Sequence, residues 1–154
     1  MKIKNIKNLI VIVFLFLNAS VLAAKDFPVS LFGIQADGKT LNTKSIQFAI
    51  DHINENVGGR LVFHAGRYLT GTISLKSNVT LHLEGGATIL GSLNPFDYEK
   101  TQAFPSFLFA FKQENIGITG TGVIDGQGKF VARYVVAFFG QGFTLDSCMF
   151  GRFS

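Results

Sequence analysis

The sequence contains no tryptophan and a single cysteine, Cys148, although 17 of its 154 residues are phenylalanine. One cysteine excludes an internal disulfide and a cysteine-based metal site, so packing alone has to hold the fold together. No other residues have metal-ligand spacing, and we expect neither a metal nor a cofactor. We interpret Cys148, which lies in a Phe-rich segment, as a packing residue rather than a nucleophile.

The chain also lacks a basic cluster. It carries 14 basic and 10 acidic residues, a net charge of +4, but three of the lysines lie within the first seven residues. If that N-terminal segment is removed, the net charge falls to about +1. We therefore do not expect a nucleic-acid partner.

The first 24 residues have the pattern of a secretory signal peptide. A basic start is followed by an uncharged apolar run at 9–17 and by small residues, with Val21 and Ala23 placed for cleavage. The apolar run is shorter than the roughly 20 residues of a membrane-spanning helix. We predict a signal peptide at 1–24, a secreted or periplasmic location for residues 25–154, and no membrane attachment after cleavage.

A short repeated unit organises the rest of the chain. Residues 78–91 read as an Asn, alternating apolar residues, a Gly-containing bend and a second apolar run ending in Gly, and residues 115–126 repeat this loosely. Strand side chains alternate between the two faces. In the first copy, the residues expected to point inward are Val79, Leu81 and Leu83, and those expected to point outward are Thr80, His82 and Glu84.

Such units bury their apolar faces only by stacking, which predicts an all-β fold of the parallel β-helix type. In the second copy, Ile116 and Ile118 take the inward places, and Val123 and Ile124 form the next strand. Two hairpins of a β-sandwich are an alternative that the pattern leaves open.

One α-helix is predicted at about residues 43–54, before the first strands. Asn42 is its expected N-cap, Leu41 and Ile46 form a hydrophobic staple, and Gly58 and Gly59 end it. Its apolar face consists of Ile46, Ala49, Ile50 and Ile53. We expect this helix to cover the open end of the first coil, although a helix on one face of an α+β sheet fits equally well.

Other elements follow from apolar runs between turn signals. The predicted short strands are 31–34, 60–63, 67–69, 73–75 and 107–111. Asp37 and Gly38 mark a turn, and residues 92–106 form a long loop of the kind that often carries function. The Phe-rich segment 129–154 does not continue the repeated pattern.

A series of motifs runs in one order through most of the chain. They are 32–33 (FG), 37–43 (DGKTLNT), 58–59 (GG), 68–71 (YLTG), 75–81 (LKSNVTL), 86–88 (GAT), 91–92 (GS) and 118–128 (ITGTGVIDGQG). This series resembles the N-terminal part of polygalacturonase-like glycoside hydrolases of family 28. The resemblance implies a right-handed parallel β-helix, with residues 25–154 forming the N-terminal part of one pectin-lyase-like domain. It also implies a secreted, inverting, metal-independent hydrolase of galacturonide or rhamnogalacturonan linkages in pectin.

The resemblance ends before the family's active site. The family's Asn-Thr-Asp, Gly-Asp-Asp, Gly-His-Gly and Arg-x-Lys blocks are all absent from this sequence. We therefore assign no catalytic residue and expect a truncated or frameshifted piece of the enzyme that is inactive alone. We also expect its uncapped C-terminal edge to promote self-association. His64 stands where the family usually has Pro, and we interpret it as a turn substitution.

No substitute pair of acid and base carboxylates is evident. We expect none of the candidate residues to be catalytic. Asp37 and Asp125 are expected in turns, Asp97 and Glu99 in a solvated loop, and His52 and His82 at solvent-facing positions, while Asp146 is isolated from other candidates.

A β-helix offers a groove along its side, in which the loop 92–106 would form one wall. The basic residues that would contact an anionic uronate polymer there are Arg67, Lys76, Lys100 and Lys112. Two other functions stay open on these residues: a pectate-lyase-like or epimerase-like β-helix enzyme, and a non-catalytic carbohydrate-binding β-helix.

Overall fold

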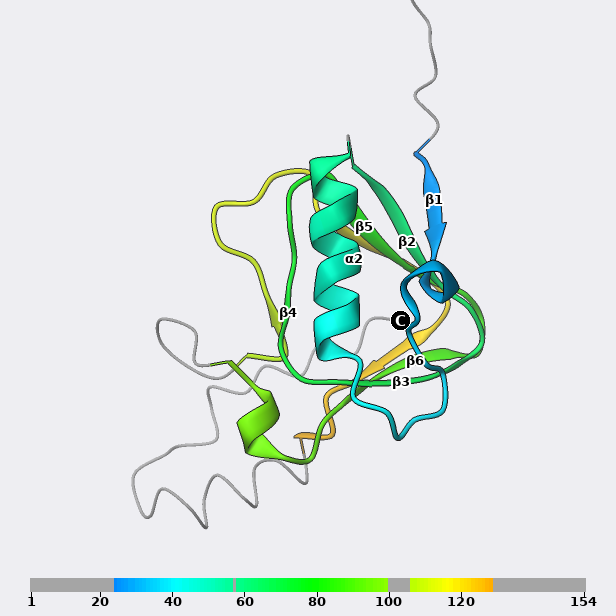
Figure 1. The fold of residues 1–154 in the computed structure, drawn as a ribbon, viewed down its shortest axis with the longest axis vertical. Helices are drawn as coiled ribbons and strands as arrows, with labels where there is room; N and C mark the ends of the chain where they lie inside the picture. Colours follow the sequence, from blue (N-terminus) through cyan, green and yellow to red (C-terminus); the bar gives the residue numbers. More distant parts are fainter. Residues whose placement is uncertain (1–23, 57, 100–105, 129–154) are drawn as a thin grey trace, which may run out of the picture.

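The computed structural model describes residues 24–56, 58–99 and 106–128, whose strands lie in three parallel sheets beside one α-helix (Figure 1). The predicted signal peptide and the Phe-rich segment with Asp146 and Cys148 lie outside the described residues, apart from Ala24. Lys100 lies outside them too.

The described chain passes through the sheets in the same order on each turn. The sheets have the strand orders β1-β2-β5-β8, β3-β6-β9 and β4-β7. The strands are β1 (Asp26–Pro28), β2 (Gly59–Phe63), β3 (Gly66–Thr70), β4 (Ile73–Ser74), β5 (Val79–Leu83), β6 (Ala87–Gly91), β7 (Leu108–Phe109), β8 (Gly117–Gly120) and β9 (Val123–Asp125). All of these pairings are parallel, which confirms the β-helix and excludes the β-sandwich alternative.

Equivalent side chains of successive coils stack in columns inside the helix. Leu61 pairs in register with Leu81, which pairs with Ile118. The predicted inward residues of β5 are all buried, and they form one core with residues of β2, β3 and the α-helix. A one-residue slip would turn such a column outward, so the alternation fixes the register.

The bend that precedes each strand of the sheet β1-β2-β5-β8 repeats between the last two described coils. Asn78 and Asn115 both adopt the left-handed conformation, with φ of 61° and 54°. Asparagine tolerates this conformation better than most residues do. The amide of Asn115 donates a hydrogen bond of 3.1 Å to the side-chain oxygen of Asn78, so the two bends also stack on each other.

The helix α2 (Thr43–Glu55) confirms the predicted element, and its four expected apolar residues are buried. A second stripe on the same helix consists of Thr43, Gln47 and Asn54. It bonds to the edge of the segment 71–77, which contains β4, on the side where no described strand pairs with it. The hydrogen bonds run from Gly71 N to Thr43 Oγ1 (2.7 Å), from Ser74 N to Gln47 Oε1 (2.9 Å), from Gln47 Nε2 to Ser74 O (3.1 Å) and from Asn54 Nδ2 to Ser77 O (2.8 Å). These side chains take the place of a neighbouring strand.

The other two walls of the first coil are covered by backbone. The strand β1 pairs with β2, and Asp37 forms an isolated parallel bridge with Arg67 on β3. The helix therefore caps one wall, as predicted, while the chain before it caps the others.

The predicted strand at 31–34 is wrong. Residues Val29–Phe32 form the short 3-10 helix η1, which ends at Gly33 with φ of 66°. The edge of β2 is already occupied by β1, so this segment does not pair with β2. Leu31 is consequently exposed.

Asn42 is the N-cap residue of α2, as predicted, and its C=O accepts the hydrogen bond of Ile46 N at 2.9 Å, but its side chain makes no capping hydrogen bond. Its amide side chain is buried and accepts from Gln35 N (2.8 Å) while donating to Gln35 O and Thr40 O (both 2.9 Å). It therefore closes the loop before the helix. The predicted staple is also wrong, because Leu41 is exposed whereas Ile46 is fully buried.

The last described coil is less buried than the sequence pattern suggests. In the predicted strand 107–111, only Leu108–Phe109 forms β7, and Phe111 is exposed. Ile118 occupies the inward register but is exposed, as is Ile116, because no described strand pairs with the outer edge of β8.

We predict that Gln47→Leu lowers the free energy of unfolding by about 1–3 kcal/mol, since it leaves both backbone groups of Ser74 without a partner. Urea unfolding followed by circular dichroism measures this. Lys44→Leu on the exposed side of the same helix is the control, with an expected change within about 0.5 kcal/mol. Equal stability of the two variants would show that the stripe does not support the β4 edge.

Candidate functional site

The described basic residues that were expected to contact a uronate polymer lie on two different sheets. Lys76 follows β4 and Lys112 follows β7, and because these strands pair, the two lysines lie toward the same end of that sheet. The ammonium of Lys112 lies 5.2 Å from the ring centroid of Phe111. Arg67 is exposed on β3 in a different sheet. The structure therefore does not bring Arg67 together with the lysines.

The long loop begins as an ordered turn rather than a solvated segment. Ser92 Oγ donates to one carboxylate oxygen of Asp97, and Asn94 Nδ2 donates to the other at 3.1 Å. Ser92 is buried and Asp97 is half-buried. Our interpretation of Asp97 as a solvated residue is therefore wrong, because its carboxylate is the centre of the turn.

The turn is docked onto the coil beneath it. Tyr98 OH donates to Ser92 O at 2.7 Å, and the ring meets Phe107 edge-on with centroids 6.3 Å apart. Burial, with the nearby Asp97 carboxylate, raises the pKa of Tyr98 to about 12. The backbone N–H of Glu99 donates to Thr72 Oγ1 at 2.9 Å.

Gly71 is the contact point beneath the loop. A Cβ on Gly71 would collide with the carbonyl oxygen of Asp97, so only glycine permits this approach.

Gln127 is a residue that sequence reasoning missed. Its side chain donates to Gly91 O at 2.6 Å, while its own N–H donates to Asp125 Oδ1 at 2.9 Å. Asp125 is therefore a turn residue, as predicted. The only sequence signal for Gln127 was its place in the motif at 118–128, because the bond joins residues 36 positions apart.

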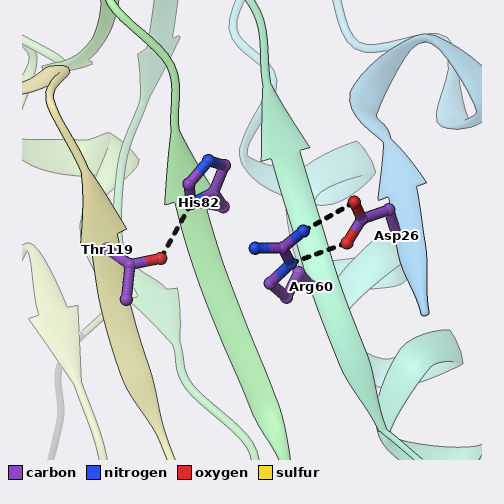
Figure 2. A network of polar contacts seen from close by, with 4 residues as sticks. All are labelled: Asp26, Arg60, His82 and Thr119. Atoms are coloured by element: carbon purple, nitrogen blue, oxygen red, sulfur yellow. Dashed lines mark hydrogen bonds and ion pairs between the residues drawn. The ribbon is translucent and has the colours of Figure 1, made fainter. Parts of the chain in front are cut away.

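The outward face of the sheet β1-β2-β5-β8 carries a set of polar links between strands (Figure 2). Arg60 donates two hydrogen bonds to the carboxylate of Asp26, at 2.6 and 2.7 Å. The hydrogen bond from Arg60 lowers the pKa of Asp26. His82 Nδ1 lies 2.9 Å from Thr119 Oγ1, so His82 faces outward as predicted. These groups join neighbouring strands at an exposed surface.

His64 does more than replace a turn residue. Its Nδ1 lies 2.8 Å from Glu84 Oε2, 20 residues further along the chain and one coil away. The substitution thus adds a polar link between coils.

His52 is exposed on α2, as predicted, but its ring also packs in an aromatic cluster. The centroids of Phe27, Phe32 and Phe48 lie 6.4, 5.8 and 6.2 Å from it.

The carboxylates with the clearest contacts have structural partners. Asp37 accepts hydrogen bonds from the N–H groups of Thr40 and Lys39 and from the Thr40 hydroxyl, which lower its pKa to about 2. Glu84, Asp97 and Asp125 are engaged as described above. The described residues hold no group of three or more His, Cys, Asp or Glu side chains suited to a metal ion. None of the helices in the described ranges is long and apolar enough to cross a membrane.

Similar proteins share both the sequence and the fold. An exo-poly-α-D-galacturonosidase of Dickeya chrysanthemi is 37% identical over 117 residues, covering 65% of this chain and 19% of the relative. A presumed glycosyl hydrolase of Parabacteroides merdae superposes with a TM-score of 0.70 and 48% identity, covering 75% of this chain and 50% of that one. A family 28 exopolygalacturonase of Yersinia enterocolitica superposes with a TM-score of 0.59 and 41% identity, covering 67% and 21% respectively. No protein-family model matches the sequence.

These similarities confirm the resemblance predicted from the motifs and the right-handed parallel β-helix that it implied. The chain spans about a fifth of the length of the Dickeya relative, and it matches a similar share of the Yersinia enzyme.

We predict that Gly71→Ala displaces the docked turn and lowers the free energy of unfolding by about 1–3 kcal/mol. Gly85→Ala is the matched control, since its Cβ would meet only Thr121 Oγ1 at 3.5 Å. Urea unfolding of both variants makes the comparison. A loss in Gly85→Ala as large as that in Gly71→Ala would contradict the assignment of Gly71 as a contact point.

Proposed function

Starting from this similarity to polygalacturonases, we propose that the chain is the N-terminal part of a pectin-degrading glycoside hydrolase that cleaves galacturonide or rhamnogalacturonan linkages. The observation that carries the proposal is identity of 41–48% to solved glycosyl hydrolases, held over two thirds or more of this chain. Conservation of the fold alone would not require such identity.

The contribution of this part is a scaffold. Inverting hydrolysis needs one carboxylic acid to protonate the leaving oxygen and one carboxylate to activate water, about 6.5–9.5 Å apart. The contacts of Asp26, Asp37 and Asp97 give those residues roles in holding strands and turns. The proposal therefore places the acid and base on coils that carry the family's missing sequence blocks.

Export is part of the same proposal. Pectin is an extracellular polymer, and a basic start followed by an uncharged run at 9–17 supports secretion through a signal peptide at 1–24. A hydrolase of this polymer acts where the polymer is.

The open face of the last described coil supports a further expectation, self-association of the isolated chain. Ile116, Ile118 and Val123 are exposed there, and no described strand pairs with the outer edges of β8 and β9. Unpaired strand edges beside apolar side chains favour pairing with another chain.

We predict that the mature chain, residues 25–154, elutes as dimers or larger species in size-exclusion chromatography with light scattering. Because the association is apolar, Ile118→Lys shifts it toward the monomer, whereas Leu31→Lys on η1 does not. A wild-type monomer at about 100 μM, roughly the concentration range in which exposed edges associate, would contradict the expectation.

We predict that the chain alone releases no reducing ends from polygalacturonate, whereas a chimaera is active. In the chimaera, residues 25–128 replace the matching coils of the Yersinia exopolygalacturonase. We expect kcat within about tenfold of the parent, because the proposed acid and base are supplied by the parent's own coils. Circular dichroism confirms folding. A folded but inactive chimaera would overturn the proposed function, and activity of the chain alone would overturn the scaffold role.

A further inference from the structure

Two lysines and two phenylalanines share the outward side of the sheet β4-β7. We call this set the β4–β7 face, and it consists of Lys76, Phe109, Phe111 and Lys112. We infer that it binds the carboxylated pyranose rings of a uronide chain, with the ammonium groups on the carboxylates and the phenyl rings on the C–H faces of the sugars. The inference rests on the proposed function and adds to it the residues that contact the polymer.

The pairing of β4 with β7 decides which side chains point outward. Ser74 pairs in register with Phe109, and Leu75 N donates to Phe109 O at 2.7 Å, so the pairing continues beyond the last residue of β4. Leu75 is buried, whereas Lys76 is half-buried. Because side chains alternate along a strand, the next outward positions are Lys76 on one strand and Phe111 on the other.

Lys112 reaches the same face through an unusual backbone conformation. Its φ is 52°, in the left-handed region that residues with a Cβ rarely adopt. The chain bends directly after Phe111, and the Lys112 ammonium lies 5.2 Å from the centroid of the Phe111 ring. An ammonium at this distance is attracted to the ring. A ring and a positive charge are thus held side by side, and Phe111 is still 52% exposed.

The β4–β7 face has neighbours on two sides. The helix α2 runs beside β4 (Figure 1), and its Gln47 is bonded to the edge of β4 that pairs with no described strand. Just before β4, Thr72 Oγ1 donates to Ser106 O at 2.6 Å and accepts from Glu99 N, so both described ends of the loop that contains η2 (Pro95–Asp97) are bonded there. A coil added to the outer edge of β7 would extend this face and leave its outward side open.

The chemistry of this set matches a uronide better than a neutral sugar. A phenyl ring offers a flat apolar face to the C–H groups of a pyranose, and cations beside it attract the carboxylate of the sugar. Within the described residues, neither Lys76 nor Lys112 forms an ion pair with a carboxylate, whereas Arg60 is occupied by Asp26. Neighbouring strands lie about 4.8 Å apart, which lets the two lysines act on one polymer chain.

We predict that Lys112→Asn separates binding from folding. Asparagine tolerates the left-handed conformation, so the free energy of unfolding should stay the same or rise, as urea unfolding measures. The affinity of the full mature chain for oligogalacturonate should fall about fivefold or more, because the variant lacks the ammonium. Calorimetric titration in about 50 mM NaCl measures the affinity. Arg67→Ala, which removes an exposed charge from a different sheet, is the matched control and should bind within about twofold of wild type.

Salt and ligand charge distinguish the two kinds of contact. Lys76→Ala and Phe111→Ala should each weaken binding about fivefold or more, whereas Phe111→Tyr should keep the affinity. In 0.5 M NaCl, roughly where the screening length falls to about 4 Å, the loss caused by Lys76→Ala should shrink, while that caused by Phe111→Ala should remain, because ring contact is not electrostatic. Fully methyl-esterified oligogalacturonate, which lacks the charge, should bind about tenfold or more weakly.

The inference fails on any of three results: equal affinity of Lys112→Asn and wild type, a loss in Arg67→Ala as large as that in Lys76→Ala, or no binding of oligogalacturonate by the wild-type chain. The chimaera separates this failure from failure of the proposed function. An active chimaera whose KM is unchanged by Lys112→Asn and by Lys76→Ala would remove the β4–β7 face from the substrate path and leave the hydrolase assignment intact.

Discussion

Each coil of this chain leaves a row of backbone N–H and C=O groups on both of its edges, and every one of them needs a partner. Parallel pairing with the next coil supplies those partners along the stack, from β2 to β5 to β8 and from β3 to β6 to β9. The same pairing sets Leu61 above Leu81 and so assembles the apolar interior. Backbone satisfaction and core burial are therefore one requirement in this fold.

The two ends of the stack meet that requirement differently. At the N-terminal end, β1 pairs with β2, and Thr43, Gln47 and Asn54 of α2 bond to the β4 wall through their side chains. At the other end, the described residues leave β8 and β9 unpaired on one side. A helix can thus satisfy the backbone groups at the edge of a sheet when polar side chains recur along one of its faces, three or four residues apart.

Local patterns predicted the elements that depend on local chemistry. Alternation located β5, and helical spacing located α2 with its buried face. Several of the missed features depend on contacts between residues that lie far apart in the sequence. Asn42 is the N-cap residue of α2, but its side chain donates to Gln35 O and Leu69 O, and His64 bonds to Glu84 in the next coil. The structural role of Asp97 could not be predicted from the sequence, because the turn held by its carboxylate packs against Gly71 on the coil beneath it.

The ordered start of the long loop has a consequence for how β-helices of this kind vary in sequence. Parallel pairing continues on both sides of the insertion, between β3 and β6 before it and between β4 and β7 after it, so the stack accommodates a long loop there. This particular loop, however, fits because the coil beneath it presents a glycine at position 71. A loop of this kind could then be transferred between relatives only together with the glycine on the coil that contacts it.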